Sequence, residues 1–379
     1  MNLFSAGVKH FLLCAVFTAA VSHSLFSAPL SGEAWKLLDI AQQALESGDY
    51  GIALKRCEEA RLAHRSLVGG YIADLEASFS PLEVRKAGDE LTAVYQVIVT
   101  RNDMVAKTIL DSVFLNYPVS RFGNSASSLM KWLSTRMVYP EADFLEGNVY
   151  RAEGEYNLAL SFYEKAWIDR EGFDIPDERF SLAYAMADLA EAMGKFGDQE
   201  KYLLLVVKED ALFGLPGNEP PTLNAILRTL SSDSSLDKFF GLYRHYNTVA
   251  LPAYNRLSRL YMNSNRPERA LPAAALGAII AVSSLSQALS GRDFEWVYSG
   301  FPGILSDAGK NSRIAEWARD SEIWAMLDTF AAVLLSLNKD SLAESVYSDL
   351  ARFCSDSDVS RRASVVLESM RQKRLQGHR

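Results

Sequence analysis

The sequence predicts an all-α fold built from repeated helix-turn-helix units. The main observation is a motif, Gly-x-Tyr-x-x-Ala, that occurs as Gly48, Tyr50 and Ala53 and again as Gly154, Tyr156 and Ala159. Each copy lies between two stretches whose apolar residues follow a helical period. Glycine is typical of a helix end, because a left-handed backbone costs little in a residue that lacks Cβ. The recurrence therefore predicts helical pairs joined by the same kind of turn.

The residues around the second copy carry small and aromatic side chains at fixed distances from the turn, as FLEGNVYRAEGEYNLALSFYEKA. We expect two antiparallel helices here, with close approach at Gly147 and Ala166 and with Tyr150 and Tyr163 filling the space beside them. This pattern resembles the tetratricopeptide repeat (TPR), a helix-turn-helix unit of about 34 residues. The resemblance implies a right-handed superhelical solenoid of the kind that usually binds other proteins.

Further copies of the pattern are recognisable along the chain. Residues 34–67 form a strong copy around Gly48, and weaker ones lie at 88–118, at 181–209, from 253 and from about 324. In the last two copies Asn265 and Asn338 stand where the turn glycine is expected, and asparagine is the next-best residue for a left-handed backbone. In the copy at 181–209, Gln199 replaces the expected alanine.

The copies are spaced too widely for a tight tandem array. The alanine position, or its substitute, falls at residues 53, 106, 159, 199, 270 and 343, and all of these gaps exceed the repeat length of about 34 residues. We expect additional helices at residues 66–79, 125–139, 222–230, 236–249 and 292–305. Because a lone repeat cannot bury its apolar face, these helices should stack with the repeats into one solenoid.

The sequence divides into a leader and two arrays. Lys9 and His10 precede an apolar run at 11–21, which predicts a secretory signal peptide over residues 1–28. The alternative is an uncleaved segment that anchors the chain in the inner membrane. An N-terminal TPR-like array is expected at 29–213 and a C-terminal one at 214–379, with a proline-containing bend at 214–221. The predicted location is the periplasm.

Charge and cysteine content restrict the function further. Without residues 1–28 the chain has 38 Lys and Arg against 47 Asp and Glu, so its net charge is near −9. A general nucleic-acid binder would be basic, so we do not expect this protein to bind nucleic acid. Only Cys57 and Cys354 remain, near opposite ends of the array, and we expect two free thiols with Cys57 as a small core residue.

Motifs of known chemistry are missing from the sequence. It has no phosphate-binding glycine loop, no Gly-x-Ser-x-Gly, no His-Glu-x-x-His and no Cys-x-x-Cys. His64, His245 and His378 are far apart, whereas a zinc site needs closely spaced ligands. We therefore predict no catalytic residue, no metal and no cofactor.

Partner binding, if it follows the family, would use the first helix of each pair. That face carries a mixture of an aromatic anchor and polar groups, which is typical of peptide-binding grooves. The alternative is that the aromatic members pack between the additional helices. The candidate groove residues are Phe144, Asn148, Arg151, Tyr184, Asp188, Asn255 and Arg259. The Lys and Asn pair with which some family members hold a C-terminal carboxylate is not present, since Phe144 and Leu38 occupy the lysine position.

The carboxyl end, residues 359–379, is basic and amphipathic. A helix over 359–376 would cap the last repeat, because a terminal repeat needs a polar outer face. The alternative is peripheral contact with anionic lipid or an acidic partner.

Taken together, these features predict a noncatalytic periplasmic scaffold that mediates protein–protein interactions in an envelope complex. The partners would be exported or envelope proteins. A first alternative is a solenoid that binds a small ligand or lipid as a transport accessory protein. A second is an enzyme subunit that acts on the cell wall without a recognisable motif.

Overall fold

The computed structural model describes residues 34–80, 90–91, 93–96, 103–116, 123–135, 137–214, 220–231 and 235–377. In these residues the chain is all-α, with two short 3₁₀ turns and no β-strand. The predicted signal peptide at 1–28 lies outside the described residues. The chain divides into two compact units, Met1–Leu182 and Ala183–Arg379, and the boundary falls within one helix. The predicted array boundary at residue 214 stays a prediction.

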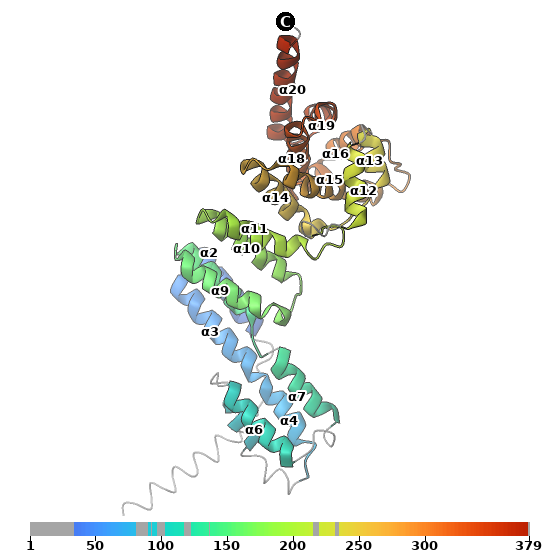
Figure 1. The fold of residues 1–379 in the computed structure, drawn as a ribbon. Helices are drawn as coiled ribbons and strands as arrows, with labels where there is room; N and C mark the ends of the chain where they lie inside the picture. The colour runs from blue at the N-terminus through green and yellow to red at the C-terminus, as the bar shows by residue number, and fades with distance from the viewer. Residues whose placement is uncertain are drawn as a thin grey trace, which may run out of the picture. The chain divides into compact units, whose positions relative to one another are not determined.

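The first unit contains two helical hairpins and a group of helices between them (Figure 1). A 3₁₀ turn, η2 (Arg170–Gly172), precedes α10, which begins in this unit. The described helices are α2 (Ala34–Ser47), α3 (Tyr50–Ser66), α4 (Val68–Glu76), α6 (Asp103–Asn116), α7 (Gly123–Thr135), α8 (Pro140–Ala152) and α9 (Tyr156–Ile168).

The second unit begins within α10 and continues to the end of the described chain. A second 3₁₀ turn, η3 (Thr248–Ala250), leads directly into α14. The helices are α10 (Glu178–Ala192), α11 (Phe196–Val207), α12 (Pro221–Ser231), α13 (Leu236–Leu242), α14 (Leu251–Asn263), α15 (Pro267–Ser290), α16 (Phe301–Lys310), α17 (Ser312–Asp320), α18 (Ile323–Ser336), α19 (Asp340–Phe353) and α20 (Ser357–Gly377).

Five hairpins share one turn, which confirms the left-handed turn residues expected from the sequence. The pairs are α2/α3, α8/α9, α10/α11, α14/α15 and α18/α19, and in each the residue two before the second helix has a positive φ. These residues are Gly48, Gly154, Gly194, Asn265 and Asn338.

The hydrogen bonds of the turn are also the same in all five hairpins. At Gly154, for example, the N–H of Glu155 donates to the carbonyl of Tyr150 at 2.9 Å, and the N–H of Gly154 donates to that of Arg151 at 3.1 Å. This is a Schellman motif, which satisfies the last carbonyls of the first helix. The same two bonds recur after Gly48, Gly194, Asn265 and Asn338.

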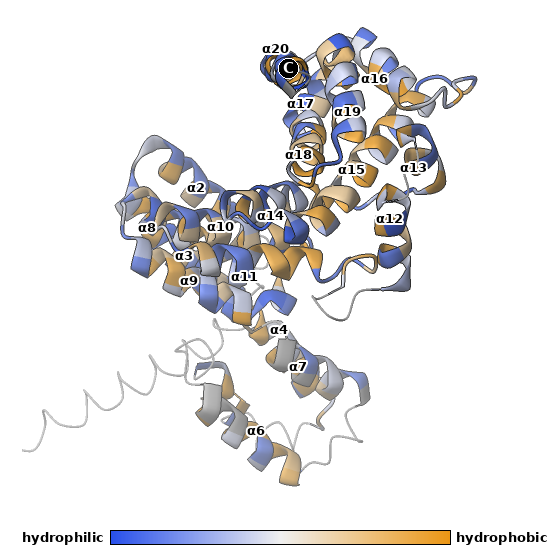
Figure 2. Cartoon of the chain, turned by 45° about the horizontal axis from the view of Figure 1, so that its top comes forward, coloured by the Kyte–Doolittle hydropathy of each residue, from blue (hydrophilic) through white to orange (hydrophobic). Residues whose placement is uncertain are grey.

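In unit 1 the hairpin α8/α9 packs on α2/α3 although residues 67–139 separate them (Figures 1 and 2). Small residues of α2 and α3 meet one larger residue of α8 in successive groups: Ala41 and Cys57 contact Leu145, and Ala44 and Ala53 contact Val149. Cys57 is fully buried and both cysteines are free, as predicted.

The intervening segment has a core of its own. Val68, Ile72 and Leu75 of α4 pack with Leu110 of α6 and with Trp132 of α7, and other buried residues complete the cluster. Apolar burial of this kind stabilises by about 25 cal/mol per Å². The segment is therefore a helical insertion between two hairpins that stack directly on each other.

In unit 2 the long helix α15 packs against α14, α18, α16 and α12 (Figure 2). Gly277 allows its close approach, because a Cβ there would lie 2.3 Å from Sδ of Met326 and 3.1 Å from Cβ of Tyr254. By length and composition α15 could cross a membrane, and it is the one helix of the described residues that could do so. Most of it, however, is buried inside unit 2. That burial is typical of a core helix.

Three sequence expectations require correction. Residues 236–249 are α-helical only as far as Leu242, because the chain from Tyr243 to η3 is held in a loop by contacts described below. Residues 291–300 are not helical either: α16 begins at Phe301, where the N–H donates to Oδ1 of Asp237 at 2.6 Å after the left-handed Gly300. Finally, the atoms nearest to the Cβ position of Gly147 belong to the ring of Tyr163 and to the carbonyl of Ala159, and not to Ala166.

Candidate functional site

A polar cleft of about 520 Å³ opens in unit 2 between α10, α11, α14 and the start of α18. Its volume lies within the range of about 300–1,000 Å³ that is usual for ligand sites. It has carboxylates, guanidinium groups and amides in its wall. The lining residues are Glu191, Phe196, Gln199, Asn255, Arg256, Arg259, Leu260, Asn263, Ser264, Glu322 and Ala325.

One side of the cleft is formed where α11 departs from the repeat pattern. Gln199 occupies the position that is alanine in the other four hairpins with the shared turn, at Ala53, Ala159, Ala270 and Ala343. It is buried, with 5% of its surface exposed, and its Nε2 donates to Oε2 of Glu191 at 2.8 Å. The larger polar side chain thus places an amide in the cleft wall and orients a carboxylate of α10.

Another part of the cleft wall has the same arrangement of a buried amide and a carboxylate. Asn255 of α14 is 1% exposed and its Nδ2 donates to Oε2 of Glu322 at 3.0 Å, while its Oδ1 accepts from Oγ1 of Thr329 at 2.7 Å. These two bonds fix the orientation of both side chains. Because a buried amide needs partners, the contact also satisfies Asn255.

Glu322 has an unusual backbone conformation. Its φ is +58°, and the other non-glycine residues with positive φ in the described chain are the turn asparagines Asn265 and Asn338. A left-handed conformation costs roughly 1–2 kcal/mol in a residue that is neither Gly nor Asn. Strain of this kind often accompanies functional positions.

The two guanidinium groups of the cleft differ in their contacts. Arg256 forms an ion pair with Asp188 and lies over the ring of Tyr184, 5.5 Å from its centroid. Arg259 is exposed, and within the described chain it forms no hydrogen bond or ion pair. The charge of Arg256 is therefore neutralised by a neighbour, whereas Arg259 remains available to a bound group.

A buried polar network supports the start of α14. The carboxylate of Asp210 is fully buried and accepts from Nε2 of His245 at 2.7 Å and from the hydroxyl of Tyr254 at 2.9 Å. Burial alone would raise the pKa of Asp210, but the hydrogen bonds from His245, Leu212 and Tyr254 hold it below its usual value. The backbone N–H of His245 also donates to Oγ of Ser283 at 3.1 Å, so the loop from Tyr243 to η3 is anchored at both sides.

The structure places four of the predicted groove residues at or beside this cleft. Asn255 and Arg259 line it, and Asp188 and Tyr184 hold Arg256. The hydroxyl of Tyr184 donates to the carbonyl of Val249 at 2.6 Å and accepts from the N–H of Ala253 at 3.1 Å. Its polar group thus joins α10 to the start of α14, and burial raises the pKa of Tyr184.

The other three predicted residues lie on α8 in unit 1, whereas the cleft is formed by unit 2 alone. Phe144 packs edge-on against the ring of Tyr163, with centroids 5.7 Å apart. The Oδ1 of Asn148 accepts from the hydroxyl of Tyr163 at 2.7 Å, and Arg151 is exposed. Sequence reasoning missed the other lining residues, among them Glu191, Phe196, Gln199, Arg256 and Glu322, although the substitution at Gln199 was an available signal.

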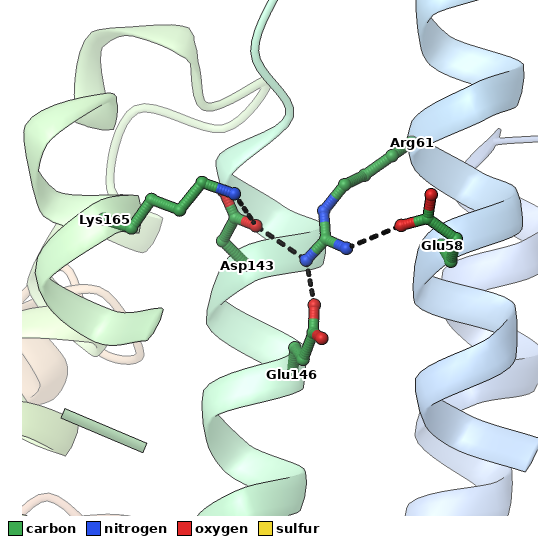
Figure 3. A network of polar contacts seen from close by, with 5 residues as sticks. All are labelled: Glu58, Arg61, Asp143, Glu146 and Lys165. Carbon is green, nitrogen blue, oxygen red and sulfur yellow. Dashed lines mark hydrogen bonds and ion pairs between the residues drawn. The ribbon is translucent and has the colours of Figure 1, made fainter. Parts of the chain in front are cut away.

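Unit 1 contains a second charged group, centred on Arg61 of α3 (Figure 3). Its Nη2 lies 2.6 Å from Oδ1 of Asp143 and also contacts Glu146, while its Nη1 lies 3.2 Å from Glu58. Lys165 approaches the same Asp143 oxygen at 2.9 Å. Burial disfavours the charge on Arg61, but Asp143 and Glu146 outweigh it and raise the pKa of Arg61. The group therefore joins α3 to α8, and its charges are already paired.

No group of three His, Cys, Asp or Glu side chains in the described chain could hold a metal ion. The chemistry offered by the cleft is hydrogen bonding and ion pairing. It presents acceptors at Glu191 and Glu322 and a donor at Arg259.

No protein-family model matches this chain. A protein of Treponema pallidum (strain Nichols), described as an uncharacterized protein, is 34% identical over 333 residues. The similarity covers 88% of this chain and 89% of the treponemal one, so it includes residues of both units. The chain belongs to the same family as this protein.

Proposed function

We propose that this protein is a noncatalytic scaffold with a TPR-like solenoid architecture that binds segments of partner proteins. The observation that carries the proposal is the polar cleft of unit 2, which four helices of successive hairpins form together. The five equal Schellman turns support the repeat assignment, because they occur at the turn position of five of the six TPR-like copies. The TPR resemblance supports protein binding.

The cleft has features that suit a protein segment. Phe196 at its rim is 60% exposed, and aromatic residues are common anchors at interfaces. Buried amides orient the carboxylates of the wall, so little side-chain freedom is lost on binding. An extended segment would find both an apolar contact and fixed hydrogen-bonding groups.

We place the scaffold in the periplasm, on the basis of the charged and apolar pattern of residues 1–28. The basic helix α20 supports the capping role more than a lipid-binding one. All four of its arginines are already paired: Arg361 with Asp358, Arg362 with Asp328, Arg371 with Glu368 and Arg374 with Glu344. Pairing reduces the charge that α20 could direct toward anionic lipid.

Site-specific photocrosslinking in the native host tests the proposal. The photoreactive amino acid p-benzoylphenylalanine replaces Phe196 at the cleft or, as a matched control, Phe294, which is 99% exposed in the loop at 291–300. We expect exported proteins to be captured from position 196 and not from 294. Capture only at position 294 would support the scaffold function but would show that the cleft is not the binding site. If no partner were captured at either position, the scaffold function would be contradicted.

A second candidate function is the binding of a small ligand or lipid as a transport accessory protein. The volume of the cleft, about 520 Å³, suits such a ligand as well. Native mass spectrometry of protein purified from its own host separates the two. A retained small mass that is lost on substitution of Arg259 by Gln would favour the ligand carrier.

A further inference from the structure

We propose that the unit 2 cleft recognises a partner segment in which a basic side chain lies close to an acidic one. This inference rests on the proposed scaffold function and specifies the chemistry of its partner. The basic group would lie against Glu191 and Glu322, and the acidic group would pair with Arg259. The argument uses the contacts that each cleft residue already has.

The carboxylates of the cleft are preorganised and incompletely used. Oε2 of Glu191 accepts from Gln199, and Oε2 of Glu322 accepts from Asn255. Neither carboxylate forms an ion pair in the described chain, although Arg256 and Arg259 line the same cleft. Each therefore keeps an oxygen for a donor, and a lysine or arginine side chain supplies such a donor with the complementary charge.

The amide of Gln199 adds a third acceptor to the cleft wall. Only 5% of this residue is exposed, and its Nε2 is committed to Glu191. Its Oε1 has no hydrogen-bond partner in the described chain. This oxygen does not belong to the fully buried side-chain atoms that lack a partner, so it reaches the solvent of the cleft. It is an acceptor that a ligand N–H could use in place of water.

The balance of charge defines the rest of the ligand. The charge of Arg256 is neutralised by Asp188, which leaves two carboxylates and the guanidinium of Arg259. A purely basic segment would place a positive charge beside Arg259, and a purely acidic one would face Glu191 and Glu322. A segment that carries both a positive and a negative side chain avoids contact between like charges in the cleft. Contacts between like charges are unfavourable, and they exclude other partners.

The test begins with selection from a phage-displayed library of random linear peptides on the immobilised protein without residues 1–28. We expect enriched peptides to carry Lys or Arg near Asp or Glu. Enrichment of peptides without this pair of charges, or absence of enrichment, would overturn the inference. In both cases the photocrosslinking experiment at position 196 still tests the scaffold function separately, because it does not depend on the charges of the peptide.

Fluorescence polarisation with a synthetic copy of the best peptide then assigns each charge. We expect Glu322→Gln to weaken binding about tenfold, and Arg259→Gln to do the same. Replacing the acidic residue of the peptide by Ser should remove the effect of Arg259→Gln but not that of Glu322→Gln. The control variants Glu368→Gln and Arg361→Gln on α20 change the same types of charge outside the cleft and should bind normally.

The substitutions are chosen so that a loss of binding cannot be attributed to unfolding. A glutamine at position 322 still offers an oxygen to Nδ2 of Asn255, so the fold should be retained, which circular dichroism would check. Gln199→Ala restores the residue that the other hairpins have, and we expect it to weaken peptide binding without loss of thermal stability. Binding that is unchanged in Glu322→Gln would overturn the assignment of the basic side chain.

Discussion

Arg61 and Asp143 form a buried ion pair, with Nη2 and Oδ1 2.6 Å apart, although they are 82 positions apart in the sequence. Both side chains are more than nine-tenths buried. The pair joins α3 of the first hairpin to α8 of the second, across the insertion that separates them (Figure 3). It is therefore a direct marker of how the hairpins of unit 1 stack.

Removal of this guanidinium should strongly destabilise unit 1. Arg61→Met would remove a positive partner that Asp143 and Glu146 share, and an uncompensated buried charge costs about 3–5 kcal/mol. Urea denaturation followed by tryptophan fluorescence would measure the loss. The double variant with Glu146→Gln should recover part of it, and a failure to recover would mean that packing, rather than charge, is responsible.

The shared turn predicts a specific order of stabilities at Gly154. Its φ is +82°, so Gly154→Ala should destabilise by about 1–2 kcal/mol. Gly154→Asn should cost less, because Asn265 and Asn338 adopt the same conformation at the same place in two other hairpins. Thermal unfolding of the three proteins would give the order, and equal values for Ala and Asn would contradict a common turn.

Glu141 makes the stability of unit 1 dependent on pH. Burial is the main reason that its pKa rises to about 7, and repulsion from Asp174 and Glu178 acts in the same direction, against the hydrogen bond from the N–H of Asp174. The folded state thus binds a proton more tightly than the unfolded one. Its stabilising contribution is full below the unfolded value near 4.5 and is lost as the pH rises through about 7.

The corresponding variant is Glu141→Gln, which keeps an oxygen for the N–H of Asp174. We expect it to be more stable than the native protein at pH 8, by up to about 3 kcal/mol, and similar at pH 4.5. Denaturation at both pH values measures this difference. An equal effect of the substitution at both values would show that the carboxyl group does not titrate in this range.

The left-handed backbone of Glu322 predicts that this residue lowers stability while its carboxylate serves binding. Glu322→Gly and Glu322→Ala both remove the carboxylate from the cleft, but only glycine adopts the observed φ of +58° without strain. We expect the glycine variant to be about 1 kcal/mol more stable than the alanine variant, while both bind the peptide more weakly than the native protein. Equal stabilities would mean that the left-handed conformation costs little here.

The five turns could be predicted because their causes are local. Glycine or asparagine at a fixed distance from two helical patterns is sufficient to specify a left-handed residue, and Gly48, Gly154, Gly194, Asn265 and Asn338 all have one. The local pattern gave a wrong helix boundary where a residue distant in sequence fixes the start of a helix. Asp237 accepts from the N–H of Phe301, so α16 begins there and not at residue 292.

The candidate site shows the same division. The helical periodicity placed Asn255 and Arg259 on one face of α14, but it could not tell that Tyr184 would be used to hold Val249 and Ala253. Nor could it show that Gln199 and Glu191 complete the wall, since their contact depends on how α10 and α11 pack.

The sequence by itself therefore determined the helical hairpins and their turns, because these follow from backbone preferences and periodicity within a few residues. The tertiary structure alone decided that α8 packs on α3 across an insertion, and that two amide-bound carboxylates and one arginine meet in a single cleft. Such contacts depend on which side chains burial brings together, and residues far apart in the chain leave no local pattern that specifies their pairing.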